Sequence, residues 1–415
     1  MINVVQLQYS TESGAFSAYR LQKAFLKAGI NSGIISLRQD RFIIDKVAYL
    51  GVKPKLISRM DDKLQSFIIG NKLNDFGLFA YPILGTNVAN LDLVKNADYI
   101  YIHWALSGFL NIKSLEQLAK LNKPIIMVMH DMWHVTGGCH YSFECEKYIT
   151  GCNECPMFIT IKKNDLAKKA FDRKMKFYSR YNNLFFVSPS KWLANIAKQA
   201  LLTKNKPVFY IPNILDNSIF KPFDKIIAKQ ILNLNTEETI IAFGAVSINN
   251  MRKGWAYLQK ALEILQQKNE IKNISILIFG SGNNAEIAAA IPFKTKFMGY
   301  LKDDYSKALV YSAADIFIVP SLADNQPTTV QESLSCGTPV VGFNVGGIPD
   351  MIIHKENGYL AEYKNAEDIA AGIKYCLQNS VKGYMLSSFQ PGETVKKHEE
   401  LFTYINSLKN TTAIA

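Results

Sequence analysis

Two acidic side chains at a fixed spacing carry the clearest chemical signal in this chain. Asp324 and Glu332 form an acid-x7-acid pair within the segment 315–350. An apolar strand at 316–320 precedes them, and a helix from about 328 to 336 carries Glu332, so both should lie at the carboxyl end of a strand. The same pattern also fits an ordinary strand–helix–strand unit whose helix has a solvated acidic face.

The start of this helix is a predicted anion site. Thr328 is the expected N-cap, Thr329 follows it, and Gly337 supplies the stop. A helix N-terminus presents N–H groups and a partial positive charge to the crevice beside a strand end. Carboxylates next to such a site suit a ligand that carries both phosphates and sugar hydroxyls.

Four of the six cysteines lie within seventeen residues, in the sequence GGCHYSFECEKYITGCNEC. Thiolates at short spacing in a chain of the reducing cytosol favour a tetrahedral structural zinc over disulfides. His134 or His140 is an alternative fourth ligand, and a redox pair or four free thiols are the competing interpretations. The predicted zinc ligands are Cys139, Cys145, Cys152 and Cys155.

The chain is basic, with a formal net charge of +12 and a pI of about 9.2. This charge favours polyanions or an anionic membrane face. Much of it gathers in one predicted helix, 162–176, where a solvated face competes with membrane docking. Nucleic acid ranks last, since the chain has no zinc-finger histidine pair, no aromatic RNA-binding strand and no basic low-complexity tail. The basic residues of this helix are Lys162, Lys163, Lys168, Lys169, Arg173, Lys174 and Lys176.

A glycine turn in the second half resembles a dinucleotide fingerprint. Gly280 and Gly282 follow a strand and open a helix at Ala285. A fingerprint of this kind also needs an acidic residue at a strand end about twenty residues further on. That residue is absent, so NAD binding is disfavoured.

The elements that must position these groups are strands alternating with helices. Such alternation over 415 residues predicts an α/β protein with two domains, each built on a parallel sheet covered on both faces. The boundary is expected near 217–223, and an amphipathic helix is expected at 391–408. The expected strands are Val4–Gln8, Tyr99–His103, Ile125–His130, Leu184–Ser188, Thr239–Ala245, Ser275–Gly280, Lys296–Gly299, Ile316–Pro320 and Pro339–Phe343.

Several segments, taken in order, resemble family four of the retaining nucleotide-sugar glycosyltransferases, of the type that builds surface polysaccharides and exopolysaccharides. They are INVVQLQYSTESGAFSAYRLQKAFLKAG, MVMHDMW, VSPSKWLANIAKQA, IPNILDNSIFKP, AFGAVSINNMRKGW and PSLADNQPTTVQESLSCGTPVVGFNVGGIPD. Two positions depart from the family pattern. Asp324 stands where the family has Glu, and Ala245 stands where it usually has Arg.

This resemblance implies the GT-B fold, which is two Rossmann-like doubly wound domains with a deep cleft between them. The implied parts are an acceptor-side domain at 1–217 with the cysteine-rich loop 139–155, a donor-binding domain at 218–390, and a helix at 391–415 that crosses back to the first domain. Residues 40–90 are interpreted as an acceptor-side insertion or lid.

The resemblance also implies roles for individual residues. Lys253 and Arg252 would hold the diphosphate, and Glu332 would bind the nucleotide ribose. Asp324 would bind the donor sugar, and His130 would reach that sugar from the first domain, although a histidine at a strand end is more often structural. The donor-binding set also includes Gly14, Thr328 and Thr329.

The implied activity is retaining transfer of a sugar from a UDP- or GDP-sugar to a glycan or lipid-linked acceptor, without a catalytic cofactor. The alternative is a GT-B protein that binds nucleotide sugar or glycan without turnover. No apolar run reaches the roughly 18–20 residues that span a bilayer, and no signal peptide is evident. We therefore expect a cytoplasmic protein, peripheral on the inner face of the membrane.

Overall fold

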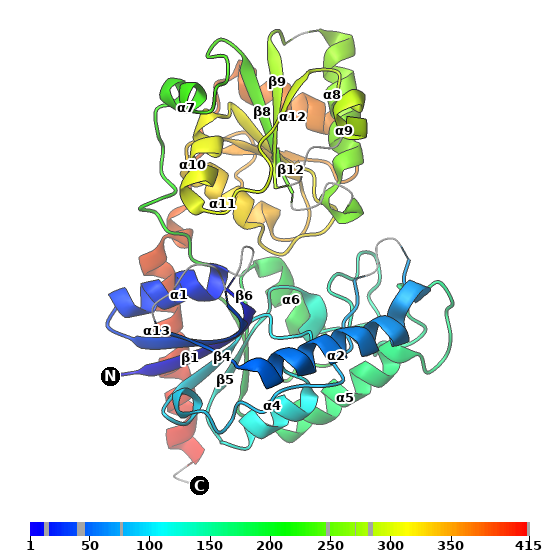
Figure 1. Ribbon diagram of the computed structural model, residues 1–415, viewed down its shortest axis with the longest axis vertical. Coiled ribbons are helices and arrows are strands. Elements are labelled where there is room, and N and C mark those ends of the chain that lie inside the picture. The colour runs from blue at the N-terminus through cyan, green and yellow to red at the C-terminus, as the bar shows by residue number, and fades with distance from the viewer. Residues whose placement is uncertain are drawn as a thin grey trace. The chain divides into compact units, whose positions relative to one another are not determined.

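The computed structural model describes residues 1–11, 16–39, 46–74, 78–245, 250–269, 271–280 and 285–412. The chain forms two compact units. The first combines Met1–Ile214 with Pro391–Ala415, and the second is Leu215–Gln390. The C-terminal helix therefore belongs to the unit that the N-terminal half builds, as Figure 1 shows for α13.

A parallel seven-stranded sheet forms the centre of the first unit among the described residues, in the order β3-β2-β1-β4-β5-β6-β7. The central strands are buried on both faces, as their runs of Ile, Val and Tyr require. The chain extends the sheet in opposite directions from β1, so the topological switch lies between β1 and β4. The strands are β1 (Asn3–Ser10), β2 (Asn31–Arg38), β3 (Val47–Tyr49), β4 (Tyr99–Ile102), β5 (Ile125–Val128), β6 (Leu184–Ser188) and β7 (Val208–Tyr210).

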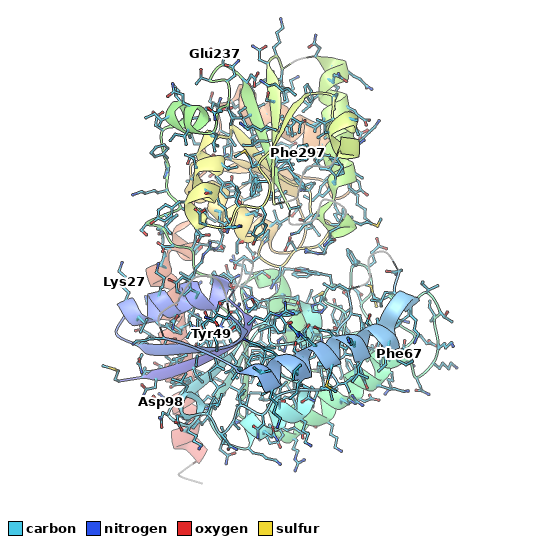
Figure 2. All side chains as sticks on the ribbon, in the orientation of Figure 1. Lys27, Tyr49, Phe67, Asp98, Glu237 and Phe297 are labelled. Carbon is cyan, nitrogen blue, oxygen red and sulfur yellow. The ribbon has the colours of Figure 1, made fainter. Side chains whose placement is uncertain are left out.

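Helices flank this sheet, and several begin at a side-chain cap. Asn111, Asp165 and Ser190 each accept a hydrogen bond from an N–H in the first turn of their helix. The long helix α2 lies in front of the sheet in Figure 1, and Phe67 is labelled near its end in Figure 2. The helices are α1 (Phe16–Lys27), α2 (Val52–Ile69), α3 (Asp92–Lys95), α4 (Ile112–Ala119), α5 (Leu166–Arg180), α6 (Lys191–Gln199) and α13 (Pro391–Thr412), with 3-10 turns at Gly70–Lys72 and Met132–His134.

The second unit repeats the doubly wound plan around a parallel six-stranded sheet of the described residues, in the order β10-β9-β8-β11-β12-β13. Its switch point lies between β8 and β11. The strands are β8 (Thr239–Gly244), β9 (Ile274–Phe279), β10 (Lys294–Phe297), β11 (Ile316–Val319), β12 (Val340–Phe343) and β13 (Gly358–Ala361). The helices are α7 (Lys225–Ile231), α8 (Trp255–Lys268), α9 (Ala285–Ala290), α10 (Asp304–Ala313), α11 (Thr328–Ser335) and α12 (Ala366–Gln378), with 3-10 turns at Met251–Lys253, Ile348–Asp350 and Ser387–Phe389.

The predicted α/β class is confirmed, and every expected strand has a counterpart within a few residues. Four strands were not expected, namely β2, β3, β7 and β13. Two of them have only three residues, and β2 and β13 contain glycine, which weakens the strand signal. The interpretation of 40–90 as an insertion also missed α2 and β3.

Three buried histidines predict an acid-sensitive fold. Burial lowers the pKa of His134 and of His398 to about 3, and holds that of His103 well below its usual value. In each case the unfolded chain binds the proton at higher pH than the folded chain. Stability is therefore complete above about pH 6.5 and falls as the pH drops toward the folded pKa values.

We expect the free energy of unfolding to fall by about 2 kcal/mol for each such histidine between pH 7 and pH 5. Denaturant unfolding at both pH values measures this loss. His398→Gln should make the loss smaller by one such increment, because it removes one titrating group. An equal pH dependence in this variant and the parent chain would contradict the assignment.

Candidate functional site

Two loops meet at the switch point of the second unit. The 3-10 turn Met251–Lys253 follows β8, and the loop after β11 begins at Pro320. The N–H of Leu322 donates to the carbonyl of Arg252 at 2.8 Å and joins the loops. Gly254 has a φ of +69°, and a Cβ there would overlap the carbonyl oxygen of Pro320, so the close approach requires glycine.

A buried carboxylate occupies this junction. Asp324 Oδ2 lies 2.6 Å from Lys253 Nζ and 3.2 Å from Arg252 Nη1, and it accepts from Ser321 Oγ at 3.3 Å. The Arg252 guanidinium also donates to the carbonyl of Ala323 at 2.7 Å. The structure therefore brings together three of the residues that the sequence singled out.

Charge compensation at Asp324 outweighs its burial. Burial alone raises the pKa of this carboxyl, but Lys253 and Arg252 lower it to about 2. Burial lowers the pKa of Lys253, and Asp324 opposes that shift. All the hydrogen bonds to this carboxylate from described side chains fall on Oδ2, so Oδ1 is the oxygen available to a ligand.

Backbone packing fixes the position of Asp324. The N–H of Gly347 donates to the Asp324 carbonyl at 3.0 Å. Gly346 has a φ of +60°, and a Cβ there would overlap that same carbonyl oxygen. The Gly-Gly sequence after β12 therefore presses directly against the acidic loop.

The N-cap of helix α11 lies one residue earlier than expected. Its N-cap is Pro327, with no side-chain cap, so the prediction of Thr328 as N-cap is wrong. Proline lacks an N–H and has a fixed φ, which suits the residue just before or at a helix start. Thr328 and Thr329 form the half-buried first turn. Gly337 ends the helix as predicted, with a φ of +87° and an N–H that donates to Leu334.

Glu332 lies on the buried side of α11. Its Oε2 accepts a hydrogen bond from the hydroxyl of Tyr311 on α10 at 3.1 Å. Glu332 therefore lies on the helix that the sequence predicts to bind the donor. Its contact with Tyr311 was not foreseen, because no local pattern links α10 to α11.

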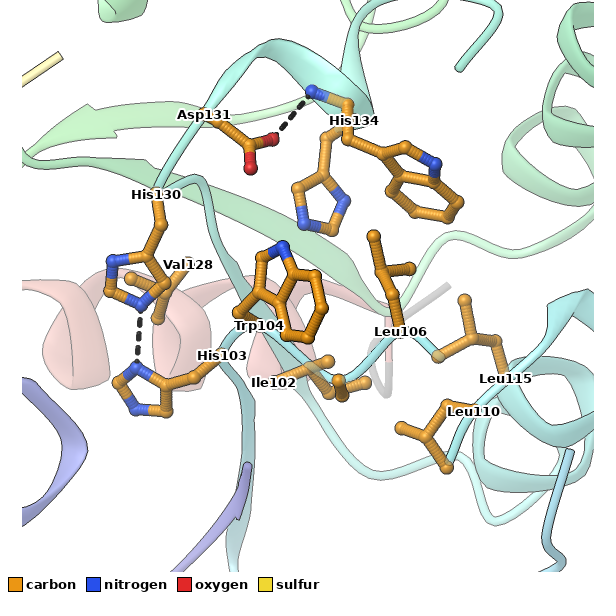
Figure 3. A pocket seen from close by; sticks show the side chains of 12 residues that line it. Ile102, His103, Trp104, Leu106, Leu110, Leu115, Val128, His130, Asp131 and His134 are labelled. Atoms are coloured by element: carbon orange, nitrogen blue, oxygen red, sulfur yellow. Dashed lines mark hydrogen bonds between the residues drawn. The ribbon is translucent and has the colours of Figure 1, made fainter. Parts of the chain in front are cut away.

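In the first unit, two histidines stack at the carboxyl ends of β4 and β5. His103 Nδ1 lies 3.0 Å from His130 Nε2 (Figure 3). His103 Nε2 lies 2.8 Å from Gln6 Oε1. Gln6 in turn donates from Nε2 to Ser32 Oγ at 3.0 Å. With this amide orientation, His103 carries its proton on Nε2 and accepts the Nε2 proton of His130.

Burial keeps His130 neutral near pH 7. Burial lowers the pKa of His130 to about 4, and Asp131 only partly opposes that shift. Nδ1 is therefore the acceptor nitrogen of the ring near neutral pH. His103 and Gln6 were missed in the sequence, although His103 follows its strand much as His130 follows the next one.

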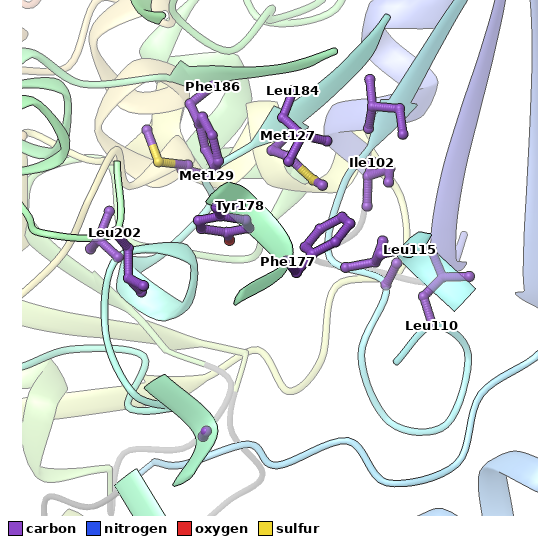
Figure 4. Close-up of a cluster of buried hydrophobic side chains, with 14 of the residues drawn as sticks. Ile102, Leu110, Leu115, Met127, Met129, Phe177, Tyr178, Leu184, Phe186 and Leu202 are labelled. Atoms are coloured by element: carbon purple, nitrogen blue, oxygen red, sulfur yellow. The ribbon is translucent and has the colours of Figure 1, made fainter. Parts of the chain in front are cut away.

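Packing beneath these histidines holds β5 in place. Phe177 and Tyr178 of α5 lie against Met127 of β5 and Phe186 of β6 (Figure 4). These side chains are almost completely buried. The strand that carries His130 is therefore backed by a tightly packed apolar layer.

The loop after His130 is anchored by Asp131. Its Oδ1 accepts from the N–H of Trp133 at 2.8 Å, and its Oδ2 lies 2.6 Å from His140 Nδ1. Burial raises the pKa of Asp131, but His140 and the Trp133 N–H lower it overall. This pairing engages His140, which the sequence offered as an alternative zinc ligand.

The four clustered cysteines line one small cavity together with Gly137 and Gly138. The N–H of Gly137 donates to Cys152 Sγ at 3.1 Å. Burial raises the pKa of Cys139, and it raises that of Cys152 to about 12 and that of Cys155 to about 11. Within the described part of the chain, no group of three or more His, Cys, Asp or Glu side chains is arranged to hold a metal ion. The geometry therefore gives the predicted zinc site no support.

Lys174 corrects the interpretation of the basic helix. Its side chain turns inward from α5, and Nζ donates to the carbonyls of Trp133 and Thr136. The ammonium also lies 3.6 Å from the centre of the Trp133 ring. Burial lowers the pKa of Lys174 to about 7. This lysine secures the loop beside the cysteines and is not part of a surface patch.

Two predicted features fall outside the described residues. Gly14, expected under the donor, lies in the segment 12–15. Most of the glycine turn at 281–284 lies outside as well. Their predicted roles stay predictions.

The match to a known protein family lies in the second unit. Residues 237–379 match the family model described as Glycosyl transferases group 1. This range holds the Lys253, Asp324 and Glu332 constellation.

Curated relatives carry similar names. An uncharacterized glycosyltransferase of Haemophilus influenzae is 30% identical over 31% of this chain and 36% of its own length. The putative colanic acid biosynthesis glycosyl transferase WcaC of Escherichia coli K12 is 23% identical over 81% of this chain and 82% of its own length. The chain spans about two-fifths or less of the first curated relatives that it matches, with 36% and 40% covered.

Solved structures share the fold of the whole chain. The Anabaena HepE structure in complex with UDP and glucose aligns with a TM-score of 0.61 at 14% identity. The alignment covers 98% of this chain and 100% of HepE. This likeness shows the fold alone.

The zinc site stays a prediction that metal analysis decides. If zinc binds, chain purified without added metal holds about one zinc per molecule. Cys152→Ser should then lose the metal and melt at lower temperature, while Cys376→Ser, a buried cysteine of α12, should keep it. Metal-free protein with unchanged melting would leave the four thiols as packing groups.

Proposed function

We propose that this chain transfers a sugar from a nucleoside diphosphate sugar, because residues 237–379 match the Glycosyl transferases group 1 family model and the chain has the GT-B fold. The proposed acceptor is a glycan or lipid-linked oligosaccharide in surface polysaccharide biosynthesis, and the proposed outcome is retention of anomeric configuration. The observation that carries the donor class is the pair of cations at the switch point of the second unit.

Lys253 and Arg252 suit the leaving diphosphate. Both cations are positioned in the ligand-free chain by Asp324, so little reorganisation is needed when an anion arrives. A diphosphate that takes over part of their charge stabilises the negative charge that develops on the departing oxygen. Protein cations of this kind perform the task that a metal ion performs in other transferases.

The first turn of α11 adds a second source of positive potential. It begins at Thr328, and no side-chain cap uses its leading N–H groups. An anion between this turn and the Met251–Lys253 turn meets charge and N–H donors from both. This arrangement supports a phosphate position beside Asp324.

Asp324 and Glu332 are assigned to different parts of the donor. Asp324 Oδ1 can accept sugar hydroxyls, and its negative charge favours a cation-like anomeric centre. Glu332, held by Tyr311, is assigned to the nucleotide ribose. In the first unit, neutral His130 at the end of β5 is assigned to the donor sugar.

The acceptor class rests on relatives. WcaC is named for colanic acid biosynthesis, and it aligns over 81% of this chain. Retention rests on the resemblance to family four. Nuclear magnetic resonance of the product's anomeric proton distinguishes retention from inversion. Slow hydrolysis of donor without acceptor separates an enzyme from a protein that only binds the nucleotide sugar.

We predict that UDP- or GDP-sugars raise the melting temperature of the chain, and that Lys253→Ala weakens donor binding by about 1.5–3 kcal/mol, the range for a charged hydrogen bond. Calorimetric titration with each nucleotide measures the loss. Lys260→Ala is the matched control, because Lys260 on α8 is exposed and pairs with Glu263. Unchanged affinity in Lys253→Ala would refute the diphosphate assignment.

Substitution of the two acids should separate turnover from affinity. Asp324→Asn should lower kcat more than it weakens donor binding, because its contacts strengthen in the transition state. Glu332→Gln should mainly weaken binding of the nucleotide, and should weaken free UDP or GDP equally. Steady-state kinetics and titration with free nucleotide distinguish the two patterns, and equal losses in both variants would contradict the division of roles.

A further inference from the structure

Helix α2 exposes an apolar stripe. Five of its apolar residues recur every three or four positions, so these five share one face of the helix. Phe67 is 86% exposed, and Val52 at the other end is 73% exposed (Figure 2). The stripe, called here the outer face of α2, consists of Val52, Leu56, Met60, Leu64 and Phe67.

The opposite face of α2 buries two polar side chains, Ser58 and Asp61, together with Ile69 at the end of the helix. Ser58 Oγ donates to the carbonyl of Ser107 at 2.7 Å. Asp61 Oδ1 accepts from the N–H groups of Ile83 and Leu84, both at 2.8 Å. Gln65 donates to Asp61 Oδ2 at 2.6 Å. The helix is therefore held to its unit by hydrogen bonds.

These bonds fix the rotation of the helix. Turning α2 to bury the outer face would strip Asp61 and the two backbone N–H groups of their partners. A buried polar group left without a partner destabilises the folded chain. The apolar stripe is thus kept outward by the polar contacts beneath it.

Cations flank the outer face. Lys53, Arg59 and Lys63 are exposed along the stripe, whereas Asp61 is buried and Asp62 is half-buried. Two further exposed apolar residues, Ile159 and Ile161, lie beyond the end of α2, because the Ile159 N–H donates to the Lys72 carbonyl at 2.7 Å. Exposed Lys162 and Lys163 follow them.

We propose that the outer face of α2 docks on an anionic lipid bilayer, with the helix lying in the plane of the interface. A membrane-surface helix combines one apolar face with flanking Lys and Arg, which is the pattern here. None of the described helices is long and apolar enough to cross a membrane.

Two other docking modes fit less well. A symmetric pair of chains would bring Arg59 and Lys63 toward the same cations of the second copy, which is repulsive. The basic helix α5 lacks an apolar stripe of this kind. Its Lys174 is buried, and its Lys168 pairs with Asp172 at 2.6 Å.

Co-sedimentation of the full chain with vesicles tests the apolar part of the proposal. We expect binding to phosphatidylglycerol-containing vesicles and little binding to pure phosphatidylcholine. The double variant Leu56→Ser with Phe67→Ser should lower the partition coefficient by roughly tenfold or more. The matched control is Ile226→Ser with Ile231→Ser, because these α7 side chains are 58% and 56% exposed.

Charge variants discriminate α2 from α5. Arg59→Gln with Lys63→Gln should weaken binding to anionic vesicles by about fivefold for each charge. Lys169→Gln with Lys176→Gln removes equal charge from exposed positions of α5 and should leave binding unchanged. The proposal is overturned by loss of binding in the α5 pair alone, by no vesicle binding in the parent chain, or by α2 variants that convert a dimer to a monomer in light scattering.

Discussion

The second unit is organised by a buried carboxylate whose charge two cations balance. Asp324 stays ionised because Lys253 and Arg252 reach it from the neighbouring loop, and glycines at 254 and 346 let the backbones come close enough for that contact. The attraction is strong because little water screens it. Removing either cation would therefore destabilise the ionised carboxylate. The same ion pairs join the loops after β8 and β11.

The first unit positions its polar side chains with hydrogen bonds between neutral groups. The chain Ser32, Gln6, His103 and His130 runs from inside the sheet to the strand ends, and each member is oriented by the one before it. One unit thus offers a fixed set of charges, which suits phosphates. The other offers a neutral ring of defined tautomer, which suits hydroxyl groups.

Local pattern predicted much of this arrangement. The Ile- and Val-rich strands and the acid pair were evident because each depends on residues close together in sequence, whereas Lys253 was indicated by the resemblance to family four. The His103–His130 pair could not be predicted, since it depends on β4 and β5 being neighbours in the sheet. The Asp324 ion pairs likewise needed the contact of β8 with β11. The exposed apolar face of helix α2 could not be predicted from its sequence. It depends on hydrogen bonds from the helix's buried polar side chains to backbone groups of residues 83, 84 and 107.

The C-terminal helix bears on how the chain can fold during synthesis. Residues Leu401, Phe402 and Ile405 of α13 pack with Phe25 and Tyr101 in one apolar cluster of the first unit. That core stays incomplete until residue 405 has been made. The second unit, by contrast, is one continuous stretch and has all its strands once residue 361 is made. The first unit is therefore translated first but completes its apolar core last. Until then, its exposed apolar surface would be open to a chaperone.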